Sequence, residues 1–107
     1  MAVAAIVTAY QRVEQLLDTL ARLQACVPPP AEIIVHVDGD NQACADAVRQ
    51  RHPGVKVLVS RGLIGPGGAR NLMVEAATQP LIASFDDDSY PMDADFFGRV
   101  EIGRAHV

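Results

Sequence analysis

The sequence predicts an α/β fold in which a mostly parallel sheet lies between two layers of helices. Strand-length segments that are apolar and β-branched alternate with helical segments along the 107 residues. Strands that are apolar throughout are typical of a parallel sheet covered by helices on both faces. Half of the residues are hydrophobic, which is enough for the core of one small domain or of part of a larger one.

The first part of the chain predicts two strands with a helix between them. Residues 3–8 are apolar and β-branched and predict a short buried strand. "VPPP" at 27–30 ends the following helix, because proline has no N–H and disfavours the helical conformation of the residue before it. "EIIVHV" at 32–37 predicts the second strand, and "DGDN" favours a turn after it. The helix is expected over residues 12–26, where the apolar side chains share one stripe: Val13, Leu16, Leu17, Leu20 and Leu23.

The second part repeats the alternation. Residues 42–52 predict a modest helix that Pro53 and Gly54 close, and residues 55–60 predict a third strand. The segment "RGLIGPGG" at 61–68 is rich in glycine and is expected to be a loop. A helix over 69–78 and a strand over 80–85 follow. The expected order is therefore β-α-β-α-β-α-β.

Composition excludes several classes of protein. The net charge is −4 and the basic residues are scattered, so the chain has no footprint for binding nucleic acid. The longest apolar run, residues 2–7, is far shorter than the roughly 20 residues that a membrane span requires. Cys26 and Cys44 lack metal-type spacing and are expected to be reduced thiols of a cytoplasmic protein. His36 alternates with apolar residues and is expected to be a structural histidine whose hydrogen bonds are satisfied.

Polar residues follow each of the four predicted strands. They comprise residues 8–10, residues 38–40, the glycine-rich segment 61–68 and the aspartates 86–88. The carboxyl ends of parallel strands meet at one edge of a sheet, and ligands of such sheets bind there. We therefore expect one binding site that draws on all four clusters.

The three aspartates in "SFDDDSY" repel one another unless a cation offsets their charge. Side chains alternate along an extended segment, so Asp86 and Asp88 face one side and Asp87 turns away. Two carboxylates in this arrangement suit Mg²⁺ or Mn²⁺, which keep further positions for water and phosphate oxygens. The alternative is a polar turn that caps a helix beginning near "MDADFF" at 92–97.

The glycine-rich segment and the second strand end supply the remaining candidates. The N–H groups of "GPGGARN" at 65–71 suit phosphate, and Arg70 adds a positive charge, although a plain loop and helix cap explains the pattern as well. The pattern is not a P-loop, which requires Gly-Lys-Ser/Thr. Asp38 is placed to accept hydrogen bonds from a base or ribose, with a simple Asp-Gly turn as the alternative. Thr8 and Tyr10 can flank the same base.

Four segments together resemble the N-terminal, nucleotide-sugar-binding half of the family-2 glycosyltransferases, which have the Rossmann-like A-type glycosyltransferase fold. The segments are "AAIVTAYQR" at 4–12, "EIIVHVDGD" at 32–40, "GPGGARN" at 65–71 and "LIASFDDDSYP" at 81–91. The resemblance implies transfer of a sugar from a UDP-, GDP- or dTDP-linked donor to a glycan, lipid or other acceptor, with Mn²⁺ or Mg²⁺.

The resemblance also implies roles for single residues. Asp86 and Asp88 match the family's Asp-x-Asp metal motif, with Asp88 as the expected direct metal ligand. Val37 and Asp40 depart from the family's usual aspartate and serine, which leaves the choice of base open. Thr8, Tyr10 and Asp38 would hold the nucleoside, and Arg70 would lie near the base or phosphates. The candidate substrate-binding residues are therefore Thr8, Tyr10, Asp38, Arg70 and Asp87.

The chain is expected to be truncated. The family's acceptor site and general base come from a later part of the chain, so no catalytic residue is expected here and the fragment by itself is expected to be inactive. Residues 101–107, "EIGRAHV", back-translate into a common sequencing adapter, so we expect native sequence to end near residue 100, with a genuine continuation of the preceding helix as the alternative. A missing part could associate with the inner face of the membrane. The alternatives are a sugar-nucleotide nucleotidyltransferase of related fold and a non-catalytic nucleotide-binding module.

Overall fold

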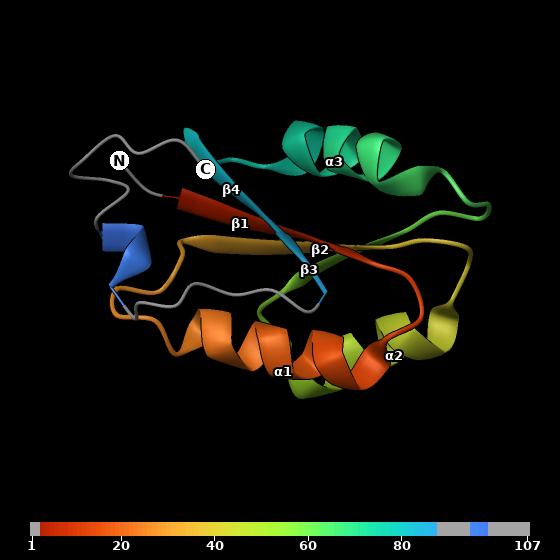
Figure 1. Ribbon diagram of the computed structural model, residues 1–107, viewed down its shortest axis with the longest axis horizontal. Coiled ribbons are helices and arrows are strands. Elements are labelled where there is room, and N and C mark those ends of the chain that lie inside the picture. Colours follow the sequence, from red (N-terminus) through yellow and green to blue (C-terminus); the bar gives the residue numbers. More distant parts are fainter. Residues whose placement is uncertain (1–2, 88–94, 99–107) are drawn as a thin grey trace.

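The computed structural model describes residues 3–87 and 95–98 and shows a four-stranded, wholly parallel sheet in the order β3-β2-β1-β4 (Figure 1). Helices lie on both of its faces, so the predicted three-layer α/β fold is confirmed. The expected tail 101–107 lies outside the described residues. The strands are β1 (Val3–Ala9), β2 (Glu32–Val37), β3 (Lys56–Val59) and β4 (Leu81–Asp86).

The helices divide unequally between the two faces of the sheet. Helices α1 (Val13–Gln24) and α2 (Gln42–Arg51) lie side by side on one face, and α3 (Gly65–Ala76) covers the other (Figure 1). Each helix connects two parallel strands, as such a sheet requires. This winding brings the carboxyl ends of all four strands to one edge of the sheet.

Two hydrophobic clusters hold the layers together, one on each face of the sheet. The larger cluster packs the fully buried Leu16, Leu20 and Leu23 of α1 against the sheet. The smaller one packs Ala69 and Met73 of α3 against the other face. Alternate residues of the inner strands β1 and β2 point to the two clusters, which explains why both strands are apolar throughout.

The start of α3 corrects the sequence prediction. Residues 61–68 were expected to be a loop, but the helix already begins at Gly65. Pro66 suits a first helical turn, because the N–H that proline lacks would have no intrahelical partner there. The Asp38 carboxylate, just after β2, accepts hydrogen bonds from the N–H groups of Ile64 and Gly65 and so caps the start of α3. A cap so distant in the sequence leaves no local signal.

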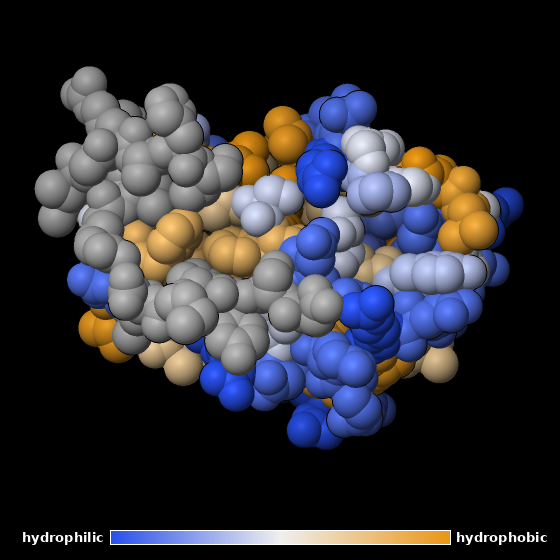
Figure 2. Space-filling model, viewed as in Figure 1, coloured by the Kyte–Doolittle hydropathy of each residue, from blue (hydrophilic) through white to orange (hydrophobic). Residues whose placement is uncertain are grey.

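The surface separates into apolar and polar regions. Figure 2 shows apolar atoms in the band where the strands lie between the helical layers, and hydrophilic side chains over α2 and the start of α1. Among the described residues, no helix has the length and hydropathy to cross a membrane. Cys26 and Cys44 are both buried and carry free thiols, as expected.

Candidate functional site

The strand register places one row of side chains at the carboxyl edge, on the face that α3 covers. His36 of β2 lies opposite Leu58 of β3 and opposite Thr8 of β1, and Thr8 lies opposite Asp86 of β4. Directly paired residues point to the same face of a sheet. One residue from each of the four strands thus lies in a row of about 15 Å, since neighbouring strands lie about 4.8 Å apart.

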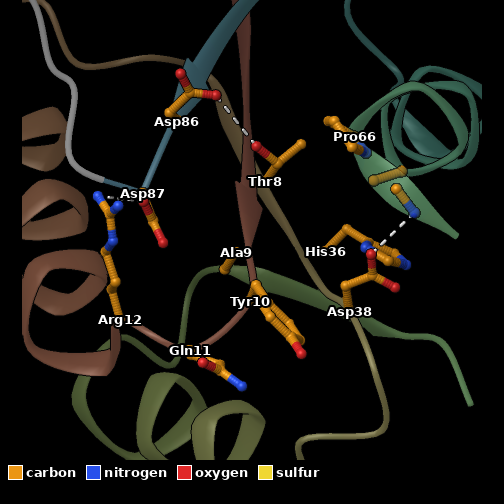
Figure 3. A pocket seen from close by; sticks show the side chains of 12 residues that line it. Thr8, Ala9, Tyr10, Gln11, Arg12, His36, Asp38, Pro66, Asp86 and Asp87 are labelled. Atoms are coloured by element: carbon orange, nitrogen blue, oxygen red, sulfur yellow. Dashed lines mark hydrogen bonds and ion pairs between the residues drawn. The ribbon is translucent and has the colours of Figure 1, made fainter. Parts of the chain in front are cut away.

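The side chains of Asp86 and Asp87 at the end of β4 point in different directions, as the alternation along an extended segment predicts. Asp86 is the last residue of β4, and its Oδ1 accepts a hydrogen bond from Thr8 Oγ1 at 3.4 Å. The Asp87 carboxylate faces α1, where its Oδ1 lies 3.9 Å from Nη1 of Arg12 (Figure 3). The hydroxyl of Thr19 donates to the Asp87 carbonyl at 2.9 Å and fixes this turn. Asp88 lies outside the described residues.

Asp38 is held firmly at the end of β2. Its Oδ1 accepts from the Ile64 N–H and the Ser60 hydroxyl, both at 2.9 Å, and its Oδ2 accepts from the Gly65 N–H at 3.0 Å. Burial by itself would raise the pKa of Asp38, but these hydrogen bonds outweigh it and hold the pKa below its usual value. The carboxylate is therefore ionised at neutral pH and fixed in orientation by α3.

A cavity of about 580 Å³ opens over this row, within the size range of small-ligand sites. Five of the predicted site residues line it together, although they come from three strands and the segments that follow them. Tyr10, which is 46% exposed, stands at the cavity near Gly39. The five predicted residues that the structure brings together are Thr8, Tyr10, Asp38, Asp86 and Asp87.

Arg70 is not among the residues that line the cavity. Its Nε donates to the Ser84 hydroxyl at 3.3 Å, further back along the strands than the polar row. Among the described residues, the positively charged side chain that lines the cavity is Arg12, which no sequence motif singles out. Arg12 directly precedes α1, and its only sequence signal was its place at the end of the segment 4–12.

His36 also lines the cavity and corrects a prediction. It was expected to be a satisfied structural histidine, but neither ring nitrogen has a hydrogen-bond partner in the part of the chain that the structure describes. Its side chain is 1% exposed. Burial lowers the pKa of His36, and the negative charge of Asp38 and an interaction with the backbone of His36 itself only partly oppose this effect. That backbone interaction does not meet the geometry of a hydrogen bond, so it leaves both ring nitrogens without a partner. The imidazole is therefore neutral at pH 7.

The residues present fit part of a metal site. No group of three or more potential ligands that could hold a metal ion occurs within residues 3–87 and 95–98. Asp86 offers a hard oxygen ligand at the cavity, of the kind that Mg²⁺ and Mn²⁺ prefer. These ions commonly take only one or two carboxylates from a protein and complete their shell with water and phosphate, so one placed carboxylate agrees with such a site.

A protein-family sequence model described as "Glycosyltransferase like family 2" matches residues 1–101. The chain belongs to this glycosyltransferase family. The resemblance inferred from the four sequence segments is thereby confirmed, and the match spans the whole sheet and the cavity. A search of curated proteins gives no match.

Solved structures of glycosyltransferases share the fold at low sequence identity. The mannosyltransferase PcManGT from Pyrobaculum calidifontis, in complex with GDP-Man and Mn²⁺, has a TM-score of 0.74 and 20% identity over 87% of this chain and 29% of its own. Residues 1–349 of S. aureus TarS, in complex with UDP, give a TM-score of 0.66 and 20% identity over 95% of this chain and 31% of theirs. The match therefore covers 29% of PcManGT and 19% of the longer TarS chain.

Proposed function

We propose that this chain forms the donor-binding part of a glycosyltransferase that takes a sugar from a nucleoside-diphosphate sugar with the help of Mn²⁺ or Mg²⁺. The observation that carries the proposal is the meeting of Thr8, Asp38 and Asp86 around one cavity at the carboxyl edge of a parallel sheet. Membership of the family and the nucleotides bound by PcManGT and TarS support it.

The negative charge around the cavity gives a reason why binding of a diphosphate should require a metal ion. Among the described residues that line the cavity, the charged side chains are the guanidinium of Arg12 and the three carboxylates of Asp38, Asp86 and Asp87. A diphosphate entering this surface alone meets net negative charge and is repelled. A divalent cation reverses that balance, so binding of the diphosphate should depend on the metal.

The two ends of the site suit the two ends of a nucleotide. The nucleoside lies toward Asp38 and Tyr10, where a fixed carboxylate accepts hydrogen bonds and an aromatic ring offers a stacking face. The diphosphate lies toward Asp86, which with Asp88 would hold the cation. A bound Mn²⁺ or Mg²⁺ supplies positive charge that stabilises the diphosphate as a leaving group. Thr8, by its hydrogen bond, orients the Asp86 carboxylate.

The proposal extends to the base of the donor nucleotide, the class of acceptor and the cellular compartment. UDP, GDP and dTDP donors all agree with a fixed carboxylate at the nucleoside end. We expect the general base that removes the proton of the acceptor to lie outside this chain. We expect the acceptor to be a glycan or a lipid. The free thiols of Cys26 and Cys44 fit a reducing compartment, which supports the cytoplasm as the place of action.

Calorimetric titration of the chain with UDP and with GDP, each with and without MnCl₂, tests the proposal. We expect binding of at least one nucleotide in the presence of Mn²⁺ and a loss of affinity of at least tenfold without it. Asp86→Asn should lower the affinity in Mn²⁺ to a similar degree.

The matched control is Asp46→Asn, which removes an exposed carboxylate of α2 that pairs with Arg49 away from the cavity. It should leave nucleotide affinity unchanged. Nucleotide binding that is indifferent to both the metal and Asp86 contradicts the proposed arrangement, and absence of binding by the folded chain contradicts the proposed function.

A further inference from the structure

His36 is the most unusual residue of the cavity. Both ring nitrogens are buried, and neither has a hydrogen-bond partner within residues 3–87 and 95–98. Buried polar groups in folded proteins nearly always have a partner, because burying one without a partner costs free energy. A polar side chain that is 1% exposed and lines a cavity therefore points to a ligand that supplies the missing partner.

The position of His36 within the row defines which part of a ligand it meets. It lies next to Thr8 on the neighbouring strand, and Thr8 separates it from Asp86, where the metal and diphosphate are expected. Asp38 follows the end of β2, two residues after His36, and Figure 3 shows the two side chains close together at the same side of the cavity. His36 thus belongs to the nucleoside end of the site.

The chemistry of the ring agrees with this position. The neutral imidazole offers one N–H donor and one nitrogen acceptor, whereas a diphosphate would favour a cationic partner. Hydroxyl groups of a ribose and carbonyl or N–H groups of a base are neutral and match one donor and one acceptor. Each ring nitrogen has less than 1 Å² of exposed area in the ligand-free chain. The proposed hydrogen bond therefore requires a half-turn about χ2, which exchanges each nitrogen with a ring carbon, together with a small shift of the side chains that cover the ring.

We propose that His36 is a specificity residue of the donor pocket and forms a hydrogen bond through its imidazole with the nucleoside of the bound nucleotide. This role rests on the proposed function, because it assumes that the cavity receives a nucleoside diphosphate. It assigns to His36 a contribution to affinity that depends on the base and ribose and not on the phosphates.

The test compares His36→Leu with the unaltered chain, using UDP, GDP and inorganic pyrophosphate as probes in the presence of MnCl₂. Leucine has a similar volume and no polar atom. We expect the affinity for the preferred nucleotide to fall roughly five- to tenfold, the value of one hydrogen bond, and the affinity for pyrophosphate to stay the same. We also expect the midpoint of thermal unfolding of the ligand-free chain to rise, because two buried nitrogens without partners are removed.

Two further variants control the comparison. His36→Gln keeps one donor and one acceptor and should recover part of the nucleotide affinity. His52→Leu replaces the histidine at the end of α2, whose Nε2 lies 3.2 Å from the Leu17 carbonyl oxygen and which does not line the donor cavity. It should leave nucleotide affinity unchanged and should not raise the unfolding midpoint.

The possible results separate this inference from the proposed function. Unchanged nucleotide affinity in His36→Leu overturns the role of His36 and leaves the proposed function standing. An equal loss for nucleotides and pyrophosphate, together with a lower unfolding midpoint, also overturns it, because such a result indicates a purely structural role. If the unaltered chain binds pyrophosphate and neither nucleotide, or binds none of the probes, the proposed function fails and the role of His36 fails with it.

Discussion

Asp38 is predicted to stabilise the fold as well as to face the ligand. Its carboxylate caps α3 from the end of β2, because the residue at the N-cap position of that helix, Ile64, provides no side-chain hydrogen bond. Asp38→Ala removes the acceptor of two backbone N–H groups and of the Ser60 hydroxyl. The start of α3 and the end of β3 should both loosen.

The expected magnitude follows from these contacts. Hydrogen bonds to a charged group contribute about 1.5–3 kcal/mol each, and loss of an N-cap typically costs about 1 kcal/mol. Both N–H hydrogen bonds to Asp38 are only partly buried, so water can replace part of what the N–H groups lose. We therefore expect Asp38→Ala to lower the free energy of unfolding by about 2–3 kcal/mol, which for a domain of this size lowers the midpoint of thermal unfolding by roughly 10–20 °C.

Far-ultraviolet circular dichroism during heating and during urea titration measures this effect. The pH dependence gives a second check with a defined sign. Because the folded pKa of Asp38 is lowered, its contribution is present above the unfolded pKa of about 3.9 and is lost as the pH falls through the folded value. The difference between the unaltered chain and Asp38→Asn should therefore shrink in acid. A variant within 0.5 kcal/mol of the unaltered chain at pH 7, roughly the effect of a neutral surface change, would refute the capping role.

Two other substitutions should destabilise the chain through different contacts. Gly39→Ala places a Cβ 3.1 Å from Leu63 Cδ2 at a φ of +79°, so thermal unfolding should show a loss of about 1–3 kcal/mol, and an unchanged midpoint would contradict the backbone conformation assigned to this turn. Glu32→Gln removes the charge that accepts from Lys56 and from the Thr78 N–H at 2.9 Å, and urea unfolding at pH 7 should show a loss of about 1–2 kcal/mol. The Glu32 side chain is only 6% exposed. Burial alone would raise the pKa of Glu32, but Lys56 and Thr78 lower it overall, so that loss should disappear as the pH falls through the folded pKa. A loss that persists in strong acid would argue against the charge as its cause.

The layers and the order of elements could be predicted because they depend on local patterns. The stripe of Leu16, Leu20 and Leu23 has helical spacing, and "EIIVHV" is apolar at nearly every position, so each predicts its own structure. Element ends were predicted less well where the deciding contact is distant. Helix α3 begins at Gly65 because Asp38 caps it from 27 residues away in sequence.

The candidate site was predicted to the extent that it follows from topology. Polar residues after parallel strands must share an edge, so the meeting of Thr8, Asp38 and Asp86 could be foreseen. The directions of the side chains on α3 could not be predicted from the sequence. Arg70 of this helix donates to Ser84 and does not line the cavity. The lack of partners at His36 depends on what packs over its strand, which no local pattern records.

The central claim is that a nucleoside diphosphate binds at the carboxyl edge of this sheet, and nuclear magnetic resonance of backbone amides tests it most directly. We would titrate the chain with UDP and with GDP in the presence of Mg²⁺ and then replace a small fraction of the Mg²⁺ by Mn²⁺. We expect shifts centred on Thr8, Asp38 and Gly65, with the strongest Mn²⁺ broadening at Asp86. Shifts centred instead on Leu17 and His52, in the groove between α1 and α2, would contradict it.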